Sequence, residues 1–155
     1  GVRLFTCDGR ELHHFCPADY VQSLCMTPDG KLLLAGTFSR GVRVIDLIAC
    51  EVRQIPQLDG LPHTPVRTMV AQDASTLLVG FDGDGVYALD LRNWQIAPQF
   101  TKSNGLLNAM GVYSICLDHE QNALCVSFHW KMSALNCSYV CFCPSIFILY
   151  YYRLI

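Results

Sequence analysis

The sequence places two carboxylates and two glycines in four consecutive positions, Asp82-Gly83-Asp84-Gly85. Carboxylates with further oxygen ligands nearby are the donors that Ca²⁺ prefers, so this stretch is the first candidate for a cation site. The equivalent stretch 44 residues upstream is Phe38-Ser39-Arg40-Gly41, which keeps only the last glycine. A hairpin turn needs residues that tolerate positive φ rather than acids. We therefore predict a turn between two strands and no metal bound by Asp82 or Asp84.

Three residues in predicted connectors and turns are candidates for binding a small ligand: His63, Asn108 and Arg40. Binding residues concentrate on loops that rigid elements hold in place. His13 and His14, by contrast, are adjacent in a predicted strand, where successive side chains point to opposite faces. We expect one of these two histidines to point inward and the other outward, so that they do not share a metal ion.

The sequence contains nine cysteines, an odd number, so at least one has no partner within the chain. The close pair Cys141-Phe142-Cys143 lacks the two-residue spacing of zinc knuckles and of redox motifs. No nucleophile elbow, phosphate-cradling glycine loop or paired-carboxylate arrangement stands out either. We therefore expect no metal, no cofactor and no catalytic centre.

The elements that would position the candidate residues form an internal repeat. Similar stretches begin at Val21, Val66 and Val112, so their starts lie 45 and 46 residues apart. Within the first two copies, glycines, leucine pairs and acids recur at an offset of 44 residues, as at Gly36 and Gly80. Self-similarity at a fixed period of this length indicates a repeat architecture.

Each repeat unit reads as four short strands separated by turn residues. In the first full unit we expect strands near 21–26, 32–36, 41–46 and 51–55, with Pro, Asp and Gly marking the turns. Four-stranded units at this spacing are typical of β-propeller blades. We predict an all-β chain of four-stranded antiparallel blades, repeating every 44–46 residues or so, in an incomplete ring: a half blade at 1–19, whole blades at 20–64 and 65–110, and a half blade at 111–130.

The repeat also predicts where several cysteines lie. Cys25 and Cys116 each follow the leading valine of their unit by four residues, where the middle unit has Val70. Free cysteine is among the most buried residue types. We therefore expect Cys25, Cys116 and Cys125, which takes the place of Leu78, to pack in the core. Three further cysteines fall near turns, where exposure is open to them: Cys7, Cys16 and Cys50. A disulfide between Cys7 and Cys16 stays open for an oxidising compartment.

Composition excludes some classes of function. Hydrophobic residues make up 52% of the chain, which favours a packed core and argues against disorder. The net charge is −2 and only 15% of residues are charged, so no basic surface for nucleic acid is expected. No signal peptide is visible at the start, which is Gly1, and we interpret the chain as a fragment or as a mature form without its leader.

The repeat resembles a known family. The pattern Val66-x-x-Met69-x-x-x-Asp73, followed by 77–80 (LLVG) and 85–87 (GVY), is similar to the regulatory propeller repeats in the sensor region of bacterial hybrid two-component systems. The connector 104–106 (NGL) is also similar, and the resemblance covers residues 1 to about 130. It implies a periplasmic sensor that passes the binding of a ligand, often a carbohydrate, to a kinase beyond the membrane. A kinase segment itself is not recognisable in this chain.

After Lys131 the repeat pattern ends, and 131–155 is an apolar, cysteine-rich tail. The glycine and alternating apolar residues expected of a third strand are missing where the blade needs them. Three interpretations stay open. The chain leaves its ancestral sequence through a shifted reading frame or a truncated gene; it carries a membrane segment, although Pro144 interrupts the apolar run; or it ends in a packed C-terminal strand.

These observations favour a non-catalytic, ligand-sensing propeller segment of a two-component signal-transduction sensor, with the membrane reached only through the parent protein. Its expected partners are an oligosaccharide or another small ligand, together with further propeller blades or a second copy of the chain. Two alternatives stay open: a propeller scaffold for protein partners, and a propeller enzyme of the lyase or hydrolase class.

Overall fold

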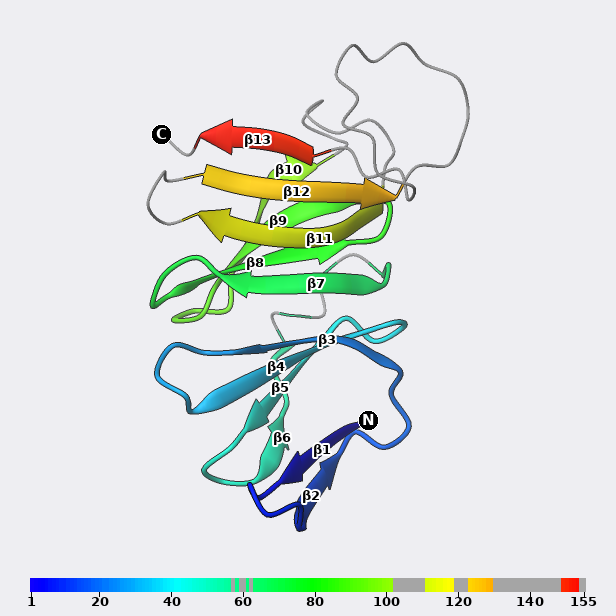
Figure 1. Ribbon diagram of the computed structural model, residues 1–155, viewed down its shortest axis with the longest axis vertical. Helices are drawn as coiled ribbons and strands as arrows, with labels where there is room; N and C mark the ends of the chain where they lie inside the picture. Colours follow the sequence, from blue (N-terminus) through cyan, green and yellow to red (C-terminus); the bar gives the residue numbers. More distant parts are fainter. Residues whose placement is uncertain are drawn as a thin grey trace.

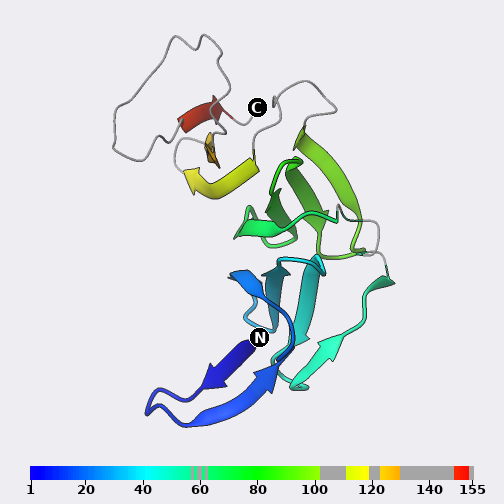
Figure 2. The same cartoon turned by 90° about the vertical axis from the view of Figure 1, so that its right-hand side faces the viewer.

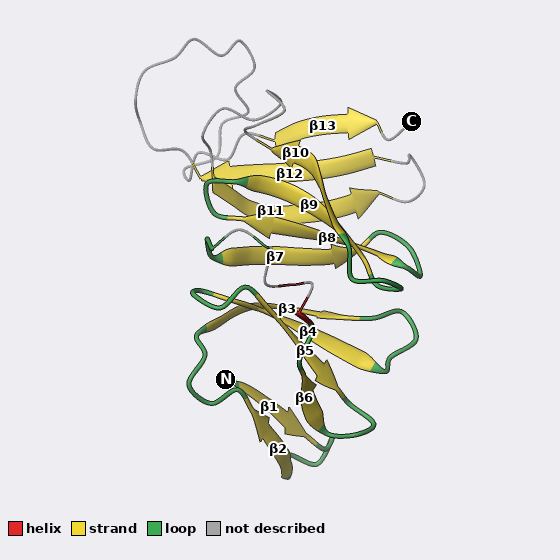
Figure 3. Ribbon diagram, turned by 180° about the vertical axis from the view of Figure 1, so that it is seen from behind, coloured by secondary structure: helices red, strands yellow, loops and turns green. Residues whose placement is uncertain are grey.

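The structure is a computed structural model that describes residues 1–56, 58, 61, 63–101, 111–118, 123–129 and 149–153. These residues form antiparallel sheets, without an α-helix in the described ranges (Figures 1 and 3). The sheets follow one another along the molecule in chain order (Figure 2). The predicted all-β class is confirmed, and the described sheets do not close into a ring.

Four sheets can be distinguished, and in each of them neighbouring strands are successive in the chain. The first has two strands, β1 (Val2–Phe5) and β2 (Glu11–Phe15). The second has four: β3 (Val21–Met26), β4 (Leu32–Thr37), β5 (Val42–Asp46) and β6 (Glu51–Arg53). The third also has four: β7 (Val66–Ala71), β8 (Thr76–Phe81), β9 (Gly85–Asp90) and β10 (Ile96–Thr101). The fourth has three: β11 (Gly111–Asp118), β12 (Ala123–His129) and β13 (Leu149–Arg153).

The hairpin between β4 and β5 shows why these segments form strands. Val42 and Val44 are buried on one face of β5 and Ile45 is buried on the other, so this strand lies between two core clusters. Gly41, directly before β5, has a φ of 63°, a conformation that glycine adopts without steric cost. The strands predicted in this unit are confirmed to within two residues at every boundary.

The repeated glycine has a packing role. A Cβ added at Gly36 would lie 2.5 Å from Cγ1 of Val66, the leading valine of the next sheet. In the same way, a Cβ at Gly80 would lie 2.6 Å from Cγ1 of Val112. Because only hydrogen fits there, each sheet can lay its first strand directly over the second strand of the sheet before it.

The first strands of successive sheets lie side by side. β7 contacts β3 on one side and β11 on the other (Figure 1). Hydrogen bonds join the sheets at equivalent places: Oγ of Ser23 donates to the carbonyl of Val66 (3.3 Å), and the amide of Ile115 donates to Oγ1 of Thr68 (3.3 Å). The glycine–valine contact therefore recurs from one sheet to the next, while the hydrogen bonds join equivalent strands through different atoms.

The core lies between the sheets rather than at one centre. A larger cluster joins the second sheet to the third through fully buried side chains such as Leu34, Val66 and Leu77. A smaller one joins the first sheet to the second through Phe15 and Ile45. Burying one aliphatic side chain of this size contributes about 1.5–3 kcal/mol, so each sheet depends on its neighbours for stability.

The prediction that Cys116 is buried was wrong, and the prediction that Cys25 packs against the core is confirmed in part. Cys116 is exposed, because it follows the buried Ile115 in β11 and so lies on the opposite face, which no described sheet covers. Cys25 is partly buried, because its face meets the third sheet. The side chain of Cys125 lies outside the described part of the structure.

The structure also shows where His13 and His14 point and whether Cys7 and Cys16 form a disulfide. Neither His13 nor His14 points inward: both are exposed, because the two-stranded first sheet buries only the last residue of β2, Phe15. His13 instead stacks on Phe15, with ring centroids 5.6 Å apart. Cys7 and Cys16 are free thiols, so no bridge joins them.

The expected third strand of the fourth sheet comes from a distant part of the tail. β13 pairs antiparallel with β12, from Ala123 opposite Arg153 to Ser127 opposite Leu149. This agrees with the interpretation of the chain end as a C-terminal strand. In the described ranges, no helix has the length and apolar character needed to cross a membrane.

Candidate functional site

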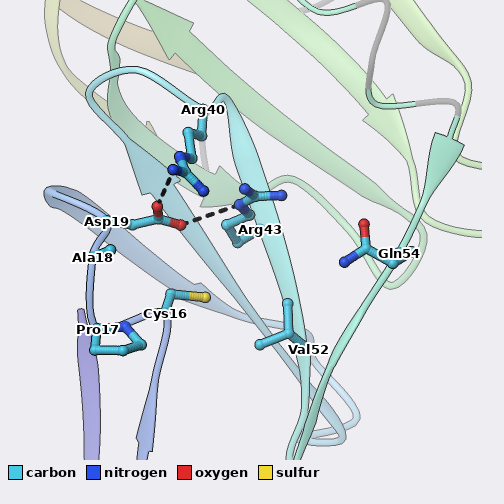
Figure 4. A pocket seen from close by; sticks show the side chains of 8 residues that line it. All are labelled: Cys16, Pro17, Ala18, Asp19, Arg40, Arg43, Val52 and Gln54. Atoms are coloured by element: carbon cyan, nitrogen blue, oxygen red, sulfur yellow. Dashed lines mark hydrogen bonds and ion pairs between the residues drawn. The ribbon is translucent and has the colours of Figure 1, made fainter.

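Two arginines and one buried aspartate meet where the first sheet passes to the second. Asp19 lies just before β3, Arg40 in the turn between β4 and β5, and Arg43 in β5. The Asp19 side chain is only 5% exposed, and its two oxygens are shared between the arginines (Figure 4). Oδ1 lies 3.2 Å from Nε of Arg40, and Oδ2 accepts a hydrogen bond of 3.2 Å from Nε of Arg43.

The local sequence explains why Asp19 is fixed. The segment from Cys16 to Asp19 forms a tight turn in which the Asp19 amide donates to the Cys16 carbonyl (3.0 Å), and Cys16 has a φ of 46°. Burial, followed by the negative charge of Asp19, raises the pKa of the Cys16 thiol. The thiol therefore stays protonated near neutral pH and is no thiolate nucleophile.

The two arginines separate two adjacent cavities. One, of about 230 Å³, lies between the turn that holds Cys16 and the strand that holds Val52 (Figure 4). The other, of about 320 Å³, lies on the connector side and is lined by Ser39, Arg40, Gly41, Arg43, Leu58, Leu61 and His63. We call the second cavity the arginine pocket. Its wall combines cationic donors with two buried leucines.

The arginine pocket contains two of the three sequence-predicted ligand residues. Arg40 and His63, which are 23 positions apart in the sequence, line the same cavity. Asn108 lies outside the described residues. Sequence reasoning missed Asp19 and Arg43. A comparison of the repeat units at these positions could have found them, because the second unit has Thr64 and Tyr87 there.

Two exposed aromatic residues adjoin the arginine cluster in the sequence. Tyr20 follows Asp19 directly, and Phe38 lies two residues before Arg40. Their rings meet edge to face with centroids 6.1 Å apart, and they are 69% and 50% exposed. The backbone holds the pair together, because the Phe38 amide donates to the Tyr20 carbonyl at 2.9 Å. Large aromatic rings left exposed to water are typical of binding surfaces.

Asp82 and Asp84 occupy the turn between β8 and β9, the counterpart of the Arg40 turn. Asp82 accepts hydrogen bonds from Nη2 (2.6 Å) and Nε (3.1 Å) of Arg67, and Asp84 accepts one of 3.2 Å from the Tyr87 hydroxyl. Burial, followed by the charge of Asp84, raises the pKa of Tyr87. Both carboxylates thus have protein partners, and no group of three metal-ligating side chains occurs among the described residues.

The turns of successive sheets share a backbone but differ in side chains. The link between Phe38 and Tyr20 recurs in the next sheet, where the Asp82 amide donates to the Pro65 carbonyl at 2.9 Å. Pro65 and Asp82 thus take the places that Tyr20 and Phe38 have in the preceding sheet. Constant backbone with variable side chains is what a binding surface on a repeat scaffold needs.

A third cavity, of about 440 Å³, lies at the other end of the second sheet and is lined in part by Asp46 and Arg53. Both of its carboxylates already have partners, since Asp29 accepts hydrogen bonds from Oγ1 of Thr27 (2.6 Å) and from the amide of Lys31 (3.1 Å). Asp46 accepts hydrogen bonds from the amides of Ala49 (2.9 Å) and Ile48 (2.8 Å) and pairs with Arg53. The hydrogen bond from the Ala49 amide lowers the pKa of Asp46 most, and the interactions with Ile48 and Arg53 lower it further. The charges there stabilise a turn, so the arginine pocket is the better candidate for ligand binding.

Comparisons with known proteins leave the family open. No protein-family model matches this chain, and no curated protein matches it.

Proposed function

We propose that this chain is a ligand-sensing segment of a β-propeller, with each sheet corresponding to a blade or part of one. Two observations support the blade interpretation: the first strands β3, β7 and β11 lie side by side, and the glycine–valine contact recurs between successive sheets. The ring of the parent protein would be completed by further blades or by a second copy of the chain. An open array of this kind leaves its outermost sheet faces uncovered.

The observation that carries the function is the arginine pocket. It places Arg40, Arg43 and His63 around one cavity at the loop end of the sheets, and two exposed aromatic residues adjoin this cluster in the sequence. Nothing in this arrangement pairs a nucleophile with a base, so we propose binding without catalysis. The ligand is a small molecule of the carbohydrate class, because sugars combine polar groups for the arginines with C–H faces for aromatic rings.

The sequence resemblance supports a wider proposal. We propose that the segment belongs to the periplasmic sensor of a hybrid two-component system, where binding at the arginine pocket would change the activity of a kinase elsewhere in the protein. Such coupling requires that the ligand bind two conformations of the sensor with different affinities. The chain itself needs no cofactor for this role.

Direct binding to the full chain tests the sensing proposal. Isothermal titration with a panel of neutral and acidic oligosaccharides should detect at least one ligand, and Arg40→Ala should weaken its binding tenfold or more. Arg10→Ala changes an arginine in the exposed turn between β1 and β2 and should leave binding unchanged. Absence of binding across the panel, or equal loss in both variants, contradicts the proposal.

A scaffold for protein partners is the second candidate function. It is favoured by apolar side chains exposed on one strand, because Leu24 and Met26 of β3 are each 53% exposed. A pull-down with the full chain discriminates the two proposals. A stable protein partner that is lost on changing Leu24 and Met26 to serine, without any response to saccharide, would favour the scaffold.

A further inference from the structure

We propose that a second copy of the chain covers the exposed side of β3 with its β11–β12 hairpin, so that two copies assemble head to tail. This inference rests on the blade interpretation in the proposed function and names the partner that completes the sheets. Three features carry it: apolar side chains that are exposed on β3 but buried at equivalent places, the composition of the first sheet, and the open side of β11.

The first strands of three sheets occupy equivalent places, but β3 has an uncovered apolar side. Leu24, Met69 and Ile115 each pair with the second strand of their own sheet, three residues after the leading valine. Met69 and Ile115 are 8% and 7% exposed, whereas Leu24 is 53% exposed. Met26, two residues further along the same face, is also 53% exposed. The side that β7 and β11 bury is therefore in water on β3.

The sheet before each strand explains the difference. Met69 shares a buried cluster with Leu34 of β4, the second strand of the sheet before it. The first sheet has no such strand among the described residues, because it consists of β1 and β2. These two match the third and fourth strands β5 and β6, since 1–4 (GVRL) corresponds to 41–44 (GVRV). The places of a first and a second strand beside β1 are thus open, and Leu24 stays uncovered.

The hairpin of β11 and β12 in a second copy supplies the two strands. β11 also has an open side: Cys116 is exposed, whereas its counterpart Cys25 in β3 is half-buried against the third sheet. The open side of β11 is the one on which a following first strand packs, and the open side of β3 is the one that packs on a preceding sheet. The two sides therefore fit each other as β3 fits β7 and as β7 fits β11 (Figure 1).

The assembly requires an exchange of strands. With β11 and β12 of one copy in place, β1 of the other copy lies where it can pair with β12, as β5 pairs with β4. In the single chain β13 occupies this edge of β12. β1 and β13 are thus alternatives for one edge, so the exchange replaces one strand pairing by another. Burial of Leu24 and Met26 then favours the assembly, which is a form of domain swapping.

The expected assembly is a closed pair. A head-to-tail interface gives a ring where the rotation closes and a filament where it does not. Each copy contributes three first strands, β3, β7 and β11, so two copies contribute six. This lies within the range of about four to eight blades found in propellers. A closed pair also covers the open sides of β3 and β11 in both copies.

Sedimentation velocity of the full chain over a range of concentrations, without ligand, tests the proposal. The parent should show a monomer–dimer equilibrium. Leu24→Asp should raise its dissociation constant at least tenfold, because burying an unpaired carboxylate is costly. Leu24→Met keeps an apolar side chain and should dimerise like the parent. Ile48→Asp is the matched control, at a side chain that is 74% exposed between β5 and β6, and should change nothing.

A disulfide trap identifies the strands that meet. Cys25 and Ala71 pack in one cluster across the second and third sheets, and the Ala71 backbone forms a hydrogen bond with the Cys25 thiol. The counterpart of Ala71 in β3 is Met26, and the counterpart of Cys25 in β11 is Cys116. Mild oxidation of the Met26→Cys variant should therefore link residue 26 of one copy to Cys116 of the other, which peptide mass spectrometry locates. Ile48→Cys should give no link to Cys116.

The outcomes separate this inference from the sensing function. A parent chain that stays monomeric at its highest soluble concentration would overturn the second copy as partner and leave the exposed side of β3 to the scaffold proposal. Dimers that Leu24→Asp does not weaken, a trapped disulfide away from Cys116, or polymers in place of dimers would overturn it as well. Titration of Arg40→Ala with the saccharide panel tests sensing independently. Because Leu24 is exposed in the single chain, every variant should keep the circular dichroism of the parent.

Discussion

Gly36 lies so close to Val66 that any side chain on the glycine would overlap the valine of the next sheet: an added Cβ would stand 2.5 Å from Val66 Cγ1. The same relationship links Gly80 to Val112 one sheet further on. This contact explains two recurring residues of the sequence repeat. The glycine and the leading valine are both needed where one sheet packs on the next. The contact also leads to a stability prediction.

Gly36→Ala should destabilise the chain by about 1–3 kcal/mol, the usual cost of overpacking a buried site. Val66 is fully buried and Ser23 closes the other side, so neither neighbour can yield freely. Urea denaturation followed by circular dichroism measures the change. Ile48→Ala, at a side chain that is 74% exposed, is the control and should stay within about 0.5 kcal/mol of the parent.

The double variant Gly36→Ala, Val66→Ala checks the mechanism. Each change alone destabilises, but shortening the valine removes the clash with its Cγ1 and leaves those with Ser23 Oγ and the Val66 Cβ, so the double variant should lose somewhat less than the sum of the two. Simple additivity would show that the two residues do not meet as the structure places them.

Asp19→Asn should lower the free energy of unfolding by about 1–2 kcal/mol. Breaking a fully buried ion pair costs about 3–5 kcal/mol, but Arg40 is 57% exposed and water screens part of the interaction. The loss arises because two guanidinium groups then face each other without the intervening negative charge. Thermal melts at low and high salt measure it, and the gap between parent and variant should narrow at high salt. An unchanged melting temperature at low salt would contradict the charge assignment.

Acid should weaken the third sheet through Asp90. The side chain of Arg92 donates two hydrogen bonds to this carboxylate and its amide donates a third, which lowers the Asp90 pKa from 3.8 to about 2. A carboxyl with a lower pKa in the folded state stabilises the fold above its unfolded pKa and loses that contribution as the pH falls. The contribution is therefore lost between about pH 4 and pH 2. Asp90→Asn should flatten the pH dependence of stability in this window, and an identical slope in parent and variant would argue against the interaction.

Cys116 of the single chain should react with a thiol reagent before Cys25. Its side chain is exposed, whereas burial raises the pKa of the Cys25 thiol and leaves less thiolate to react. Brief treatment of dilute protein with iodoacetamide, followed by peptide mass spectrometry, gives the order of modification. The exposed Cys7 serves as the positive control, and earlier labelling of Cys25 would place its sheet face in solvent.

The sequence predicted the repeating framework well because local signals determine it. Alternating apolar residues and turn glycines define the strand from Val21 to Met26 and the turn that contains Asp82, and both lie where the pattern indicated. The burial of Cys116 was predicted wrongly because the repeat assumes that every unit has a neighbour. β13 escaped prediction because 149–153 lacks the glycine and alternation of the other third strands.

The candidate site was predicted only in part, for a related reason. Arg40 and His63 were selected because they lie in loops, and the fold brings them to one cavity. Asp19 and Arg43 were missed because their importance lies in a contact across two sheets, which no local pattern reports. A comparison of the side chains at equivalent positions of the repeat units would have predicted Asp19 and Arg43 better.

The central claim is that the arginine pocket is where this chain binds a ligand, and amide chemical shifts of the ¹⁵N-labelled full chain test it most directly. Titration with an oligosaccharide that binds in the calorimetric panel should move the signals of 16–20, 38–43 and 61–64, leaving those of the opposite turns near 29–31 and 46–50 in place. Shifts confined to those opposite turns, or no shifts at saturating ligand, would contradict the account.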